Sequence, residues 1–286
     1  MTTNKQSKKI VSALKGLASS GKTEFSLNQL RVIIALERLV ARLESNPILS
    51  KHLVFKGGFA LLKHLNSARF THDLDASYFL FPLDRLIPLI KDSISANLED
   101  GLWYGDVRHE SILIENDYDG IRFNCAFQIG ESPNSEAKIK KLSRIHFDIG
   151  LSDEKFPQLE KMDMPSFIED NRSVSWYVYP LEQIFAEKLE TFVKRGAKNS
   201  RAKDLYDMVS IYPHCSNAVN LTKTIQQVFR DRNTDLPKSV KVFGENLDLE
   251  ILRASWRSVI IPEPKPSFDD TWHKLLNILS ALEEQF

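Results

Sequence analysis

The chain has 286 residues, of which 42% are hydrophobic and 27% are charged, a composition typical of a globular protein with a substantial core. Thirty-eight basic residues balance thirty-eight acidic ones, which excludes a whole-molecule basic field, so nucleic-acid contact would need a local patch. The two cysteines, Cys125 and Cys215, are too few and too far apart for a disulfide framework or a zinc site. Because no signal-peptide core or membrane-length apolar stretch occurs, we expect a cytoplasmic protein with no membrane partner.

The segment from Gly16 to Thr23 matches the P-loop pattern in full. That pattern has a mechanical meaning only when a buried strand leads into it and a helix leads out. The residues before Gly16 favour a helical turn instead. A capping-box pattern at Ser26 and Gln29 starts a separate long amphipathic helix that ends before Asn46. We therefore interpret the P-loop match as accidental.

The middle third of the chain has a mixed α/β pattern. Short helices are expected from Phe59 to about residue 65 and over residues 83–98. A turn at residues 116–119 is expected to join two of the strands. We expect strands at residues 52–55, 69–78, 111–115, 120–129 and 144–150.

The last third of the chain is predicted to be helical. Pro157 and Pro165 within residues 157–179, with Pro180 directly after them, make this segment resemble an irregular connection between domains. We therefore expect one domain over residues 1–180, with an N-terminal helical segment, and a helical domain over residues 181–286. The helices are expected at residues 181–195, 201–212, 219–230, 247–257 and 268–284.

Three carboxylates are the candidate metal ligands. Asp73 and Asp75 are two residues apart on a predicted strand, so both side chains leave the same face, about 6.6 Å apart at the backbone. Asp148 is the only acid inside another strongly alternating strand. If the two strands are neighbours, the three acids share one patch, whose mutual repulsion a divalent cation such as Mg²⁺ or Mn²⁺ would relieve. The simpler alternative is a solvated strand face, but the Gly57-Gly58 turn upstream offers backbone N–H groups to a phosphate.

Lys188 lies inside the apolar stripe of the helix predicted over residues 181–195. A buried ammonium needs an anionic partner or a route to water. It could be a structural ion pair, a side chain reaching solvent, or a phosphate clamp facing the metal site. Asp204 and Asp207 on the next helix could pair with it. Glu187 and Glu190 fall outside the stripe and are expected on a solvated face.

Two basic segments could form a rim for RNA phosphates, although such runs are more often solvated loops. One is the loop over residues 195–203. The other contains Lys138, Lys140, Lys141 and Arg144.

An ordered series of motifs resembles the AbiEii/AbiGii toxin family. The motifs are FKGG (55–58), RFTHDLD (69–75), YDGIR (118–122), HFDIG (146–150), YPLEQIFAEKLE (179–190) and RGAKNSRAKDLYD (195–207). The resemblance covers roughly residues 10–212. It departs from the family at Phe59, where relatives usually carry a small or hydroxyl residue.

The resemblance implies an α+β fold: a DNA polymerase β-like nucleotidyltransferase core with a mixed sheet, N-terminal helices and a helical C-terminal domain. By position, Asp73, Asp75 and Asp148 would bind metal, and Asp148 could also help to deprotonate the attacking hydroxyl. The catalytic residues implied are Asp73, Asp75, Asp148, Lys188, Asp204 and Asp207. The nucleotide-binding residues expected with them are Lys56, Gly57, Gly58, Arg69, Thr71, Arg122 and Arg201.

Members of this family act as toxins of bacterial toxin–antitoxin or phage-defence modules, and some add nucleotides to the acceptor end of tRNA and block translation. We therefore expect Mg²⁺- or Mn²⁺-dependent transfer of NMP from an NTP to RNA, with tRNA as acceptor and a possible cognate antitoxin as partner. Two alternatives stay open. The acceptor could be a protein or a small molecule, or the chain could be a non-catalytic regulator that binds nucleotide or RNA.

Overall fold

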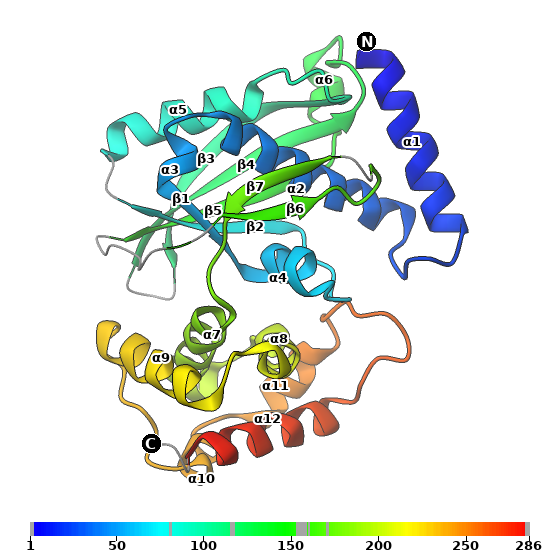
Figure 1. Cartoon of the computed structure of the whole chain (residues 1–286). Coiled ribbons are helices and arrows are strands. Elements are labelled where there is room, and N and C mark those ends of the chain that lie inside the picture. Colours follow the sequence, from blue (N-terminus) through cyan, green and yellow to red (C-terminus); the bar gives the residue numbers. More distant parts are fainter. Residues whose placement is uncertain are drawn as a thin grey trace. The chain divides into compact units, whose positions relative to one another are not determined.

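The computed structural model describes residues 3–79, 82–114, 118–152, 159, 161–169 and 172–283. The chain forms two compact units, Met1–Val178 and Tyr179–Phe286 (Figure 1). The first is mixed α/β and the second is helical, which confirms the α+β fold class. Among the described residues, no helix combines the length and apolarity needed to cross a bilayer.

A five-stranded mixed sheet organises the first unit. Its strands follow the order β1-β2-β5-β4-β3, with β2 and β5 parallel and the other neighbours antiparallel. The separate pair β6–β7 is antiparallel. The strands are β1 (Leu53–Lys56), β2 (Asp73–Phe79), β3 (Leu102–Ile114), β4 (Tyr118–Ile129), β5 (Arg144–Ser152), β6 (Lys161–Pro165) and β7 (Ser173–Tyr177). The helices are α1 (Thr3–Ser19), α2 (Leu27–Ser45), α3 (Leu49–His52), α4 (Gly57–Leu65), α5 (Leu83–Ser95) and α6 (Glu136–Ile139).

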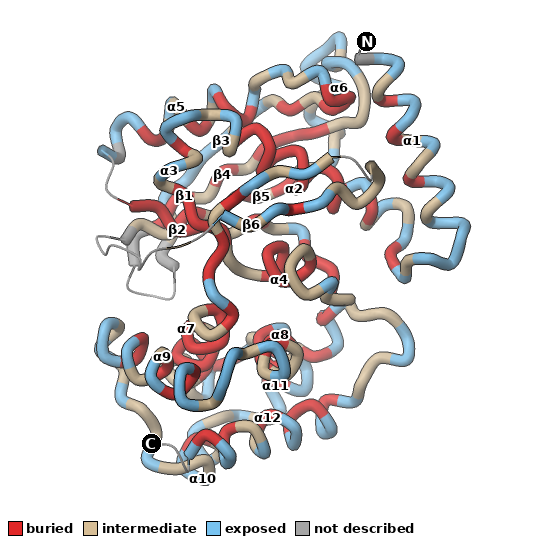
Figure 2. The backbone as a smooth tube through the Cα atoms, in the orientation of Figure 1, coloured by how far each residue is buried: buried red, intermediate tan, exposed pale blue. Residues whose placement is uncertain are grey.

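Strand alternation gives the sheet one apolar and one polar face. Phe123, Phe147 and Ile149 are fully buried on the apolar face. Helix α2 packs against β4 and β5, and α5 packs against β3. Almost every position of α2 between Leu30 and Leu43 is buried (Figure 2). The polar face therefore carries the charged side chains of the same strands.

The P-loop-like segment is not a P-loop. Gly16 lies inside α1, and Ser19 ends that helix. The Ser26 side chain then accepts from Gln29 N while the Gln29 side chain accepts from Ser26 N, the predicted capping box. Since a helix rather than a strand leads into the motif, its interpretation as accidental is confirmed.

Several expectations about element boundaries were wrong. Residues 157–179 contain the β6–β7 pair rather than irregular chain alone. Strand β2 begins at Asp73, not at residue 69, because its pairing with β5 starts there. Strand β3 begins at Leu102, well before the predicted residue 111. Residues 115–117 lie outside the described part, and with them half of the turn expected at 116–119, whose other half, Tyr118 and Asp119, begins β4.

The second unit consists of helices. Its five long predicted helices are present, and α10 was missed. The helices are α7 (Leu181–Arg195), α8 (Ala202–Ile211), α9 (Ala218–Asp231), α10 (Val240–Glu245), α11 (Leu249–Trp256) and α12 (Phe268–Glu283), with 3₁₀ turns η1 (Gly196–Lys198) and η2 (Tyr212–His214). Stacked aromatic rings join α7, α10 and α12: Phe243 lies 6.2 Å from Phe192 and 5.8 Å from Trp272 between ring centroids.

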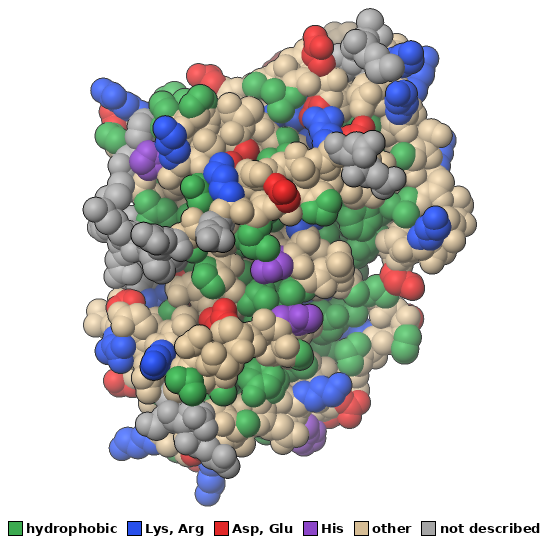
Figure 3. Space-filling view, in the orientation of Figure 1, with side chains coloured by type: hydrophobic (Ala, Val, Ile, Leu, Met, Phe, Trp, Pro, Cys, Tyr) green, Lys and Arg blue, Asp and Glu red, His purple; other side chains and the backbone are tan. Residues whose placement is uncertain are grey.

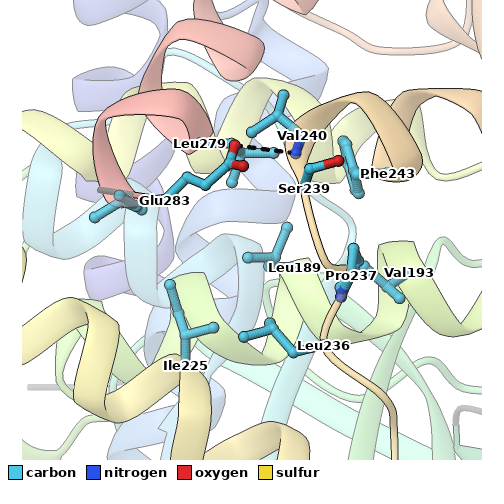
Figure 4. A pocket seen from close by; sticks show the side chains of 11 residues that line it. Leu189, Val193, Ile225, Leu236, Pro237, Ser239, Val240, Phe243, Leu279 and Glu283 are labelled. Carbon is cyan, nitrogen blue, oxygen red and sulfur yellow. Dashed lines mark hydrogen bonds between the residues drawn. The ribbon is translucent and has the colours of Figure 1, made fainter. Parts of the chain in front are cut away.

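An apolar cavity of about 40 Å³ remains between α7, α9, α10 and α12 (Figure 4). Leu189, Ile225 and Phe243 line it. Its one carboxylate, Glu283, accepts from the backbone N–H of Val240 at 3.1 Å. With so few polar groups and so little volume, this cavity is core space rather than a nucleotide site.

Candidate active site

The three predicted acids share the polar face of the sheet. Asp75 lies directly opposite Asp148 in the parallel β2–β5 pair, so their backbones are about 4.8 Å apart. Asp73 is two residues before Asp75 and projects from the same face. The sequence left open whether these strands were neighbours, and the structure shows that they are.

The acids belong to two rungs, meaning rows of residues that face one another across the strands. The first rung is Lys56, Asp75, Asp148, Arg122 and Glu110. The second rung is Asp73, His146, Asn124 and Arg108. In the first rung Asp75 and Asp148 are direct neighbours, and the basic residues Lys56 and Arg122 flank this acidic pair, which limits the repulsion between the two carboxylates.

The Gly-Gly turn packs directly against Asp75. Gly57 has φ +74°, a left-handed conformation that favours glycine, and a β-carbon at this position would collide with the Asp75 carboxylate. A β-carbon on Gly58 would meet the end of Arg69 and lie 3.3 Å from Thr71. Helix α4 starts here, so its unbonded first-turn N–H groups open beside the acids.

Arg69 and Thr71 lie beneath this helix start. Both are buried, and the Thr71 hydroxyl accepts from the backbone N–H of Asp73 at 3.3 Å. Their position suits supporting the turn and the first acid. Lys56 precedes the turn and lies opposite Asp75.

The far end of α4 is anchored in the core by Lys63. Its ammonium group bonds to Glu37 of α2 at 3.0 Å and to the Pro165 carbonyl at 2.5 Å, and both charged side chains are buried. Breaking a buried pair of this kind costs about 3–5 kcal/mol, so the direction of α4 is strongly determined.

Arg122 holds Asp148 with two parallel hydrogen bonds. Its Nε donates to Oδ1 at 2.8 Å and its Nη2 to Oδ2 at 2.6 Å. The bond to Asp148 raises the pKa of Arg122 above its ordinary value. Asp73 has a weaker neighbour in His146, whose Nδ1 lies 3.2 Å from its Oδ1. Sequence reasoning placed His146 on this face but missed its contact with Asp73.

The donor set fits a hard divalent cation. Asp73 and Asp75 supply carboxylate oxygens from one strand face, and Asp148 adds a third carboxylate from the next strand. In the described part of the chain, no three His, Cys, Asp or Glu side chains are already drawn together around one point. Arg122 takes both oxygens of Asp148, so a cation bound there would compete with this guanidinium.

Lys188 is the centre of a buried ion cluster in the helical unit. Its ammonium group lies 2.6 Å from Asp204 Oδ1 and 2.9 Å from Asp207 Oδ2, and its side chain is 10% exposed. Of the alternatives that the sequence left open, an anionic partner is the one that the structure shows, and both candidate acids, Asp204 and Asp207, pair with Lys188. Arg201 also donates to Asp204. Burial raises the pKa of Asp204, but Arg201 and Lys188 outweigh it and hold that pKa well below its ordinary value.

The expectation for the polar side of α7 was wrong. Glu187 and Glu190 are buried rather than solvated. Arg232 lies 3.1 Å from Glu187 and 3.0 Å from Glu190. Helix α9 packs against α7, and the chain that follows it brings Arg232 over this side.

Acidic and basic side chains are interspersed on the visible surface, as the net charge of zero suggests (Figure 3).

The predicted site residues fall into two sets. The α/β unit holds Lys56, Gly57, Gly58, Arg69, Thr71, Asp73, Asp75, Arg122 and Asp148. The helical unit holds Lys188, Arg201, Asp204 and Asp207.

Comparisons with known proteins agree with this fold. A family profile described as "Nucleotidyl transferase AbiEii toxin, Type IV TA system" matches residues 38–274. The crystal structure of JHP933 from Helicobacter pylori is similar, with a TM-score of 0.53 and 16% identity over 91% of this chain and 94% of that one. A Helicobacter pylori protein described as a candidate nucleotidyltransferase gives a TM-score of 0.56 and 16% identity over 91% of this chain and 97% of that one. No curated protein sequence gives a significant match.

Proposed function

Because the chain belongs to the AbiEii toxin family of nucleotidyltransferases, we propose that it transfers NMP from an NTP to RNA, at the acceptor end of tRNA. The observation that carries the proposal is the pairing of Asp75 with Asp148 beside the glycine start of α4. A phosphate cradle next to a patch of carboxylates is the combination that nucleotidyl transfer requires.

Asp73, Asp75 and Asp148 would hold Mg²⁺ or Mn²⁺, which when bound stabilises negative charge on the triphosphate. The first-turn N–H groups of α4 bind a phosphate and orient it toward the acids. The acceptor hydroxyl oxygen forms a bond to the α-phosphorus, the bond to the β-phosphate oxygen breaks, and pyrophosphate leaves with that electron pair. The Asp148 carboxylate, once it leaves Arg122, accepts the hydroxyl proton.

The family motifs that contain Lys188, Asp204, Asp207 and Arg201 support a role for this cluster of the helical unit in nucleotide binding. Two acids, Asp204 and Asp207, balance two cations, Lys188 and Arg201, so the cluster is neutral as a whole. Arg201 is 29% exposed, which leaves it able to meet a phosphate while Lys188 stays in the core. A cognate antitoxin protein and a cytoplasmic location belong to the same proposal.

The test uses α-labelled NTPs, a divalent cation and total RNA. We expect label in RNA with the wild-type protein, and its loss in Asp75→Asn, which keeps the side-chain volume but removes the charge. Asp84→Asn on the exposed side of α5 is the matched control and should label normally. Label found on protein or on a small molecule would show that this molecule, and not RNA, is the acceptor. No labelled product with any NTP would refute it.

A further inference from the structure

The polar face of the sheet continues beyond the two acid rungs. A third rung consists of Arg144, Ala126 and Gly105, and a fourth pairs Gln128 with Trp103. Successive rungs are two residues apart along each strand, so Trp103 lies about 20 Å from the first rung. That distance is the length of a few unpaired nucleotides.

Trp103 stands out among the four tryptophans of the chain. Trp176, Trp256 and Trp272 are at most 6% exposed, whereas Trp103 is only half-buried. Its six-membered ring occupies the space where a β-carbon on Gly105 would be. The indole therefore covers the bare glycine backbone of the sheet and presents an aromatic surface on a polar face.

A β-bulge separates this tryptophan from the acids. The β3–β4 register shifts between Gly105 and Arg108, and Asp106 within the bulge has φ +45°. The bulge lets Asp106 accept from Arg108 at 2.8 Å and from Arg144 at 2.8 Å. One carboxylate thereby fixes two guanidinium groups between the tryptophan and the acids.

Exposed basic groups lie on this path between the tryptophan and the acids. Arg108 is 62% exposed, and exposed lysines Lys138, Lys140 and Lys141 precede Arg144 at the start of β5. Arg108 and Arg144 thus supply positive groups on the second and third rungs and the lysines supply more at the sheet end, while the first rung carries Asp75 and Asp148 together with Arg122. Such a path suits a chain of phosphates whose last hydroxyl must reach the acids.

Building on the proposed function, we infer that the face from Trp103 to Asp148 binds the single-stranded 3′ end of the acceptor RNA. One base stacks on Trp103, and Arg108 contacts a phosphate between it and the reacting end. An aromatic platform beside exposed basic groups is the combination by which proteins bind single strands without reading their sequence. The surface lies entirely within the α/β unit.

The experiment measures binding without NTP. The probes are an RNA hairpin with a four-nucleotide 3′ overhang, the same hairpin with a blunt end, and one with a 5′ overhang. We expect the 3′ overhang to quench tryptophan fluorescence, and this quenching to be lost in Trp103→Phe. Trp103→Leu should weaken binding of the 3′ overhang by about 5- to 150-fold, the range for removing one stacked base.

Arg108→Gln should weaken binding and lower its salt dependence by about one phosphate contact. Arg253→Gln is the matched control, because Arg253 is also exposed and paired with an aspartate, Asp269 at 2.7 Å. Circular dichroism and the melting temperature check that each variant is folded.

The inference is overturned if the 3′ overhang binds no better than the blunt hairpin, or if folded Trp103→Leu binds it as the wild type does. In either case the wild type can still label RNA, and the proposed function stands. Failure of the proposed function looks different, since no label would enter RNA whatever the binding result. A raised KM for RNA with an unchanged KM for NTP in Trp103→Leu would link the two.

Discussion

Replacing Gly57 with alanine should disable the enzyme through Asp75. The left-handed backbone at Gly57, with φ +74°, costs an alanine about 1–2 kcal/mol. The new β-carbon would also overlap the Asp75 carboxylate, so that side chain must move. Since a displacement of about 1 Å at a catalytic group can cost roughly 100-fold in rate, we expect Gly57→Ala to lose at least that much NMP transfer.

The neighbouring glycine provides a close comparison. A β-carbon on Gly58 would meet the flexible end of Arg69 at 2.5 Å, and its φ is not in the left-handed region. Arg69 can shift, so we expect Gly58→Ala to keep much more activity than Gly57→Ala. The assay is initial-rate labelling of RNA with α-labelled NTP, with the melting temperature measured for each variant.

Gly16 is the control for the substitution itself. It lies in α1, and a β-carbon there would have no neighbour within 4 Å. Gly16→Ala should therefore raise stability by about 0.5–1 kcal/mol and leave activity unchanged, whereas Gly57→Ala should lower the melting temperature by roughly 2–8 °C. Wild-type activity in Gly57→Ala would refute the reasoning, because the Asp75 carboxylate would then tolerate the β-carbon.

Three further predictions concern charged pairs. Arg122→Gln should tighten Mn²⁺ binding, measured by electron paramagnetic resonance, by about 10-fold or more, because the guanidinium no longer competes for Asp148. Asp204→Asn should lower the free energy of unfolding by about 3–5 kcal/mol at pH 7. The pKa of Asp204 in the folded state is depressed, so the stabilisation from its carboxylate is present above the unfolded pKa of about 3.9 and is lost as the pH falls below that value. Urea unfolding at a series of pH values should therefore show the difference in unfolding free energy between the wild type and Asp204→Asn becoming smaller as the pH falls. Arg42 of α2 donates to both carboxylate oxygens of Asp100, at 2.6 and 2.8 Å, and both side chains are buried. Arg42→Met leaves Asp100 buried and unpaired and should cost about 3–5 kcal/mol, and Arg42→Met with Asp100→Leu should recover most of that loss in a double-mutant cycle.

Each of these predictions has an outcome that contradicts it. Unchanged or weaker Mn²⁺ binding in Arg122→Gln would mean that the guanidinium orients the carboxylate for the cation. A stability difference for Asp204→Asn that stays constant down to pH 2 would mean that its ionisation does not contribute. Additive losses in the double variant of Arg42 and Asp100 would show that this pair is not coupled.

The sequence predicted the faces of the strands but not their register. Alternation alone put Asp73 and Asp75 on one side of β2 and Asp148 on one side of β5. Asp75 and Asp148 share a rung because β2 pairs with β5, and local periodicity does not predict which strands pair or in which register. The same holds for Arg122, whose strand was predicted correctly while its contact with Asp148 was not.

Two errors in the secondary structure have local causes. In β3, the bulge after Gly105 shifts the alternation of apolar and polar residues. The apolar positions Leu102 and Tyr104 are therefore out of phase with the later part of the strand, and the sequence pattern does not join the two parts. In β6 and β7, short alternating runs are present, but the prolines of this segment, Pro165 among them, indicated an irregular connection. Pro165 lies at the end of an edge strand, a position where a missing N–H costs little.

Helix α7 shows what a periodic pattern can and cannot reveal. Lys188 stood out because a charge inside an apolar stripe conflicts with its surroundings, and the conflict predicted an acidic partner that the structure supplies twice. Glu190 gave no such signal, since a carboxylate outside the stripe looks solvated whether or not another segment covers it. Its burial follows from Arg232, 42 residues later, which neutralises it. The sequence of one helix is therefore enough to identify a charged residue inside its apolar stripe. The burial of a charged residue outside the stripe can be predicted only when its partner is known.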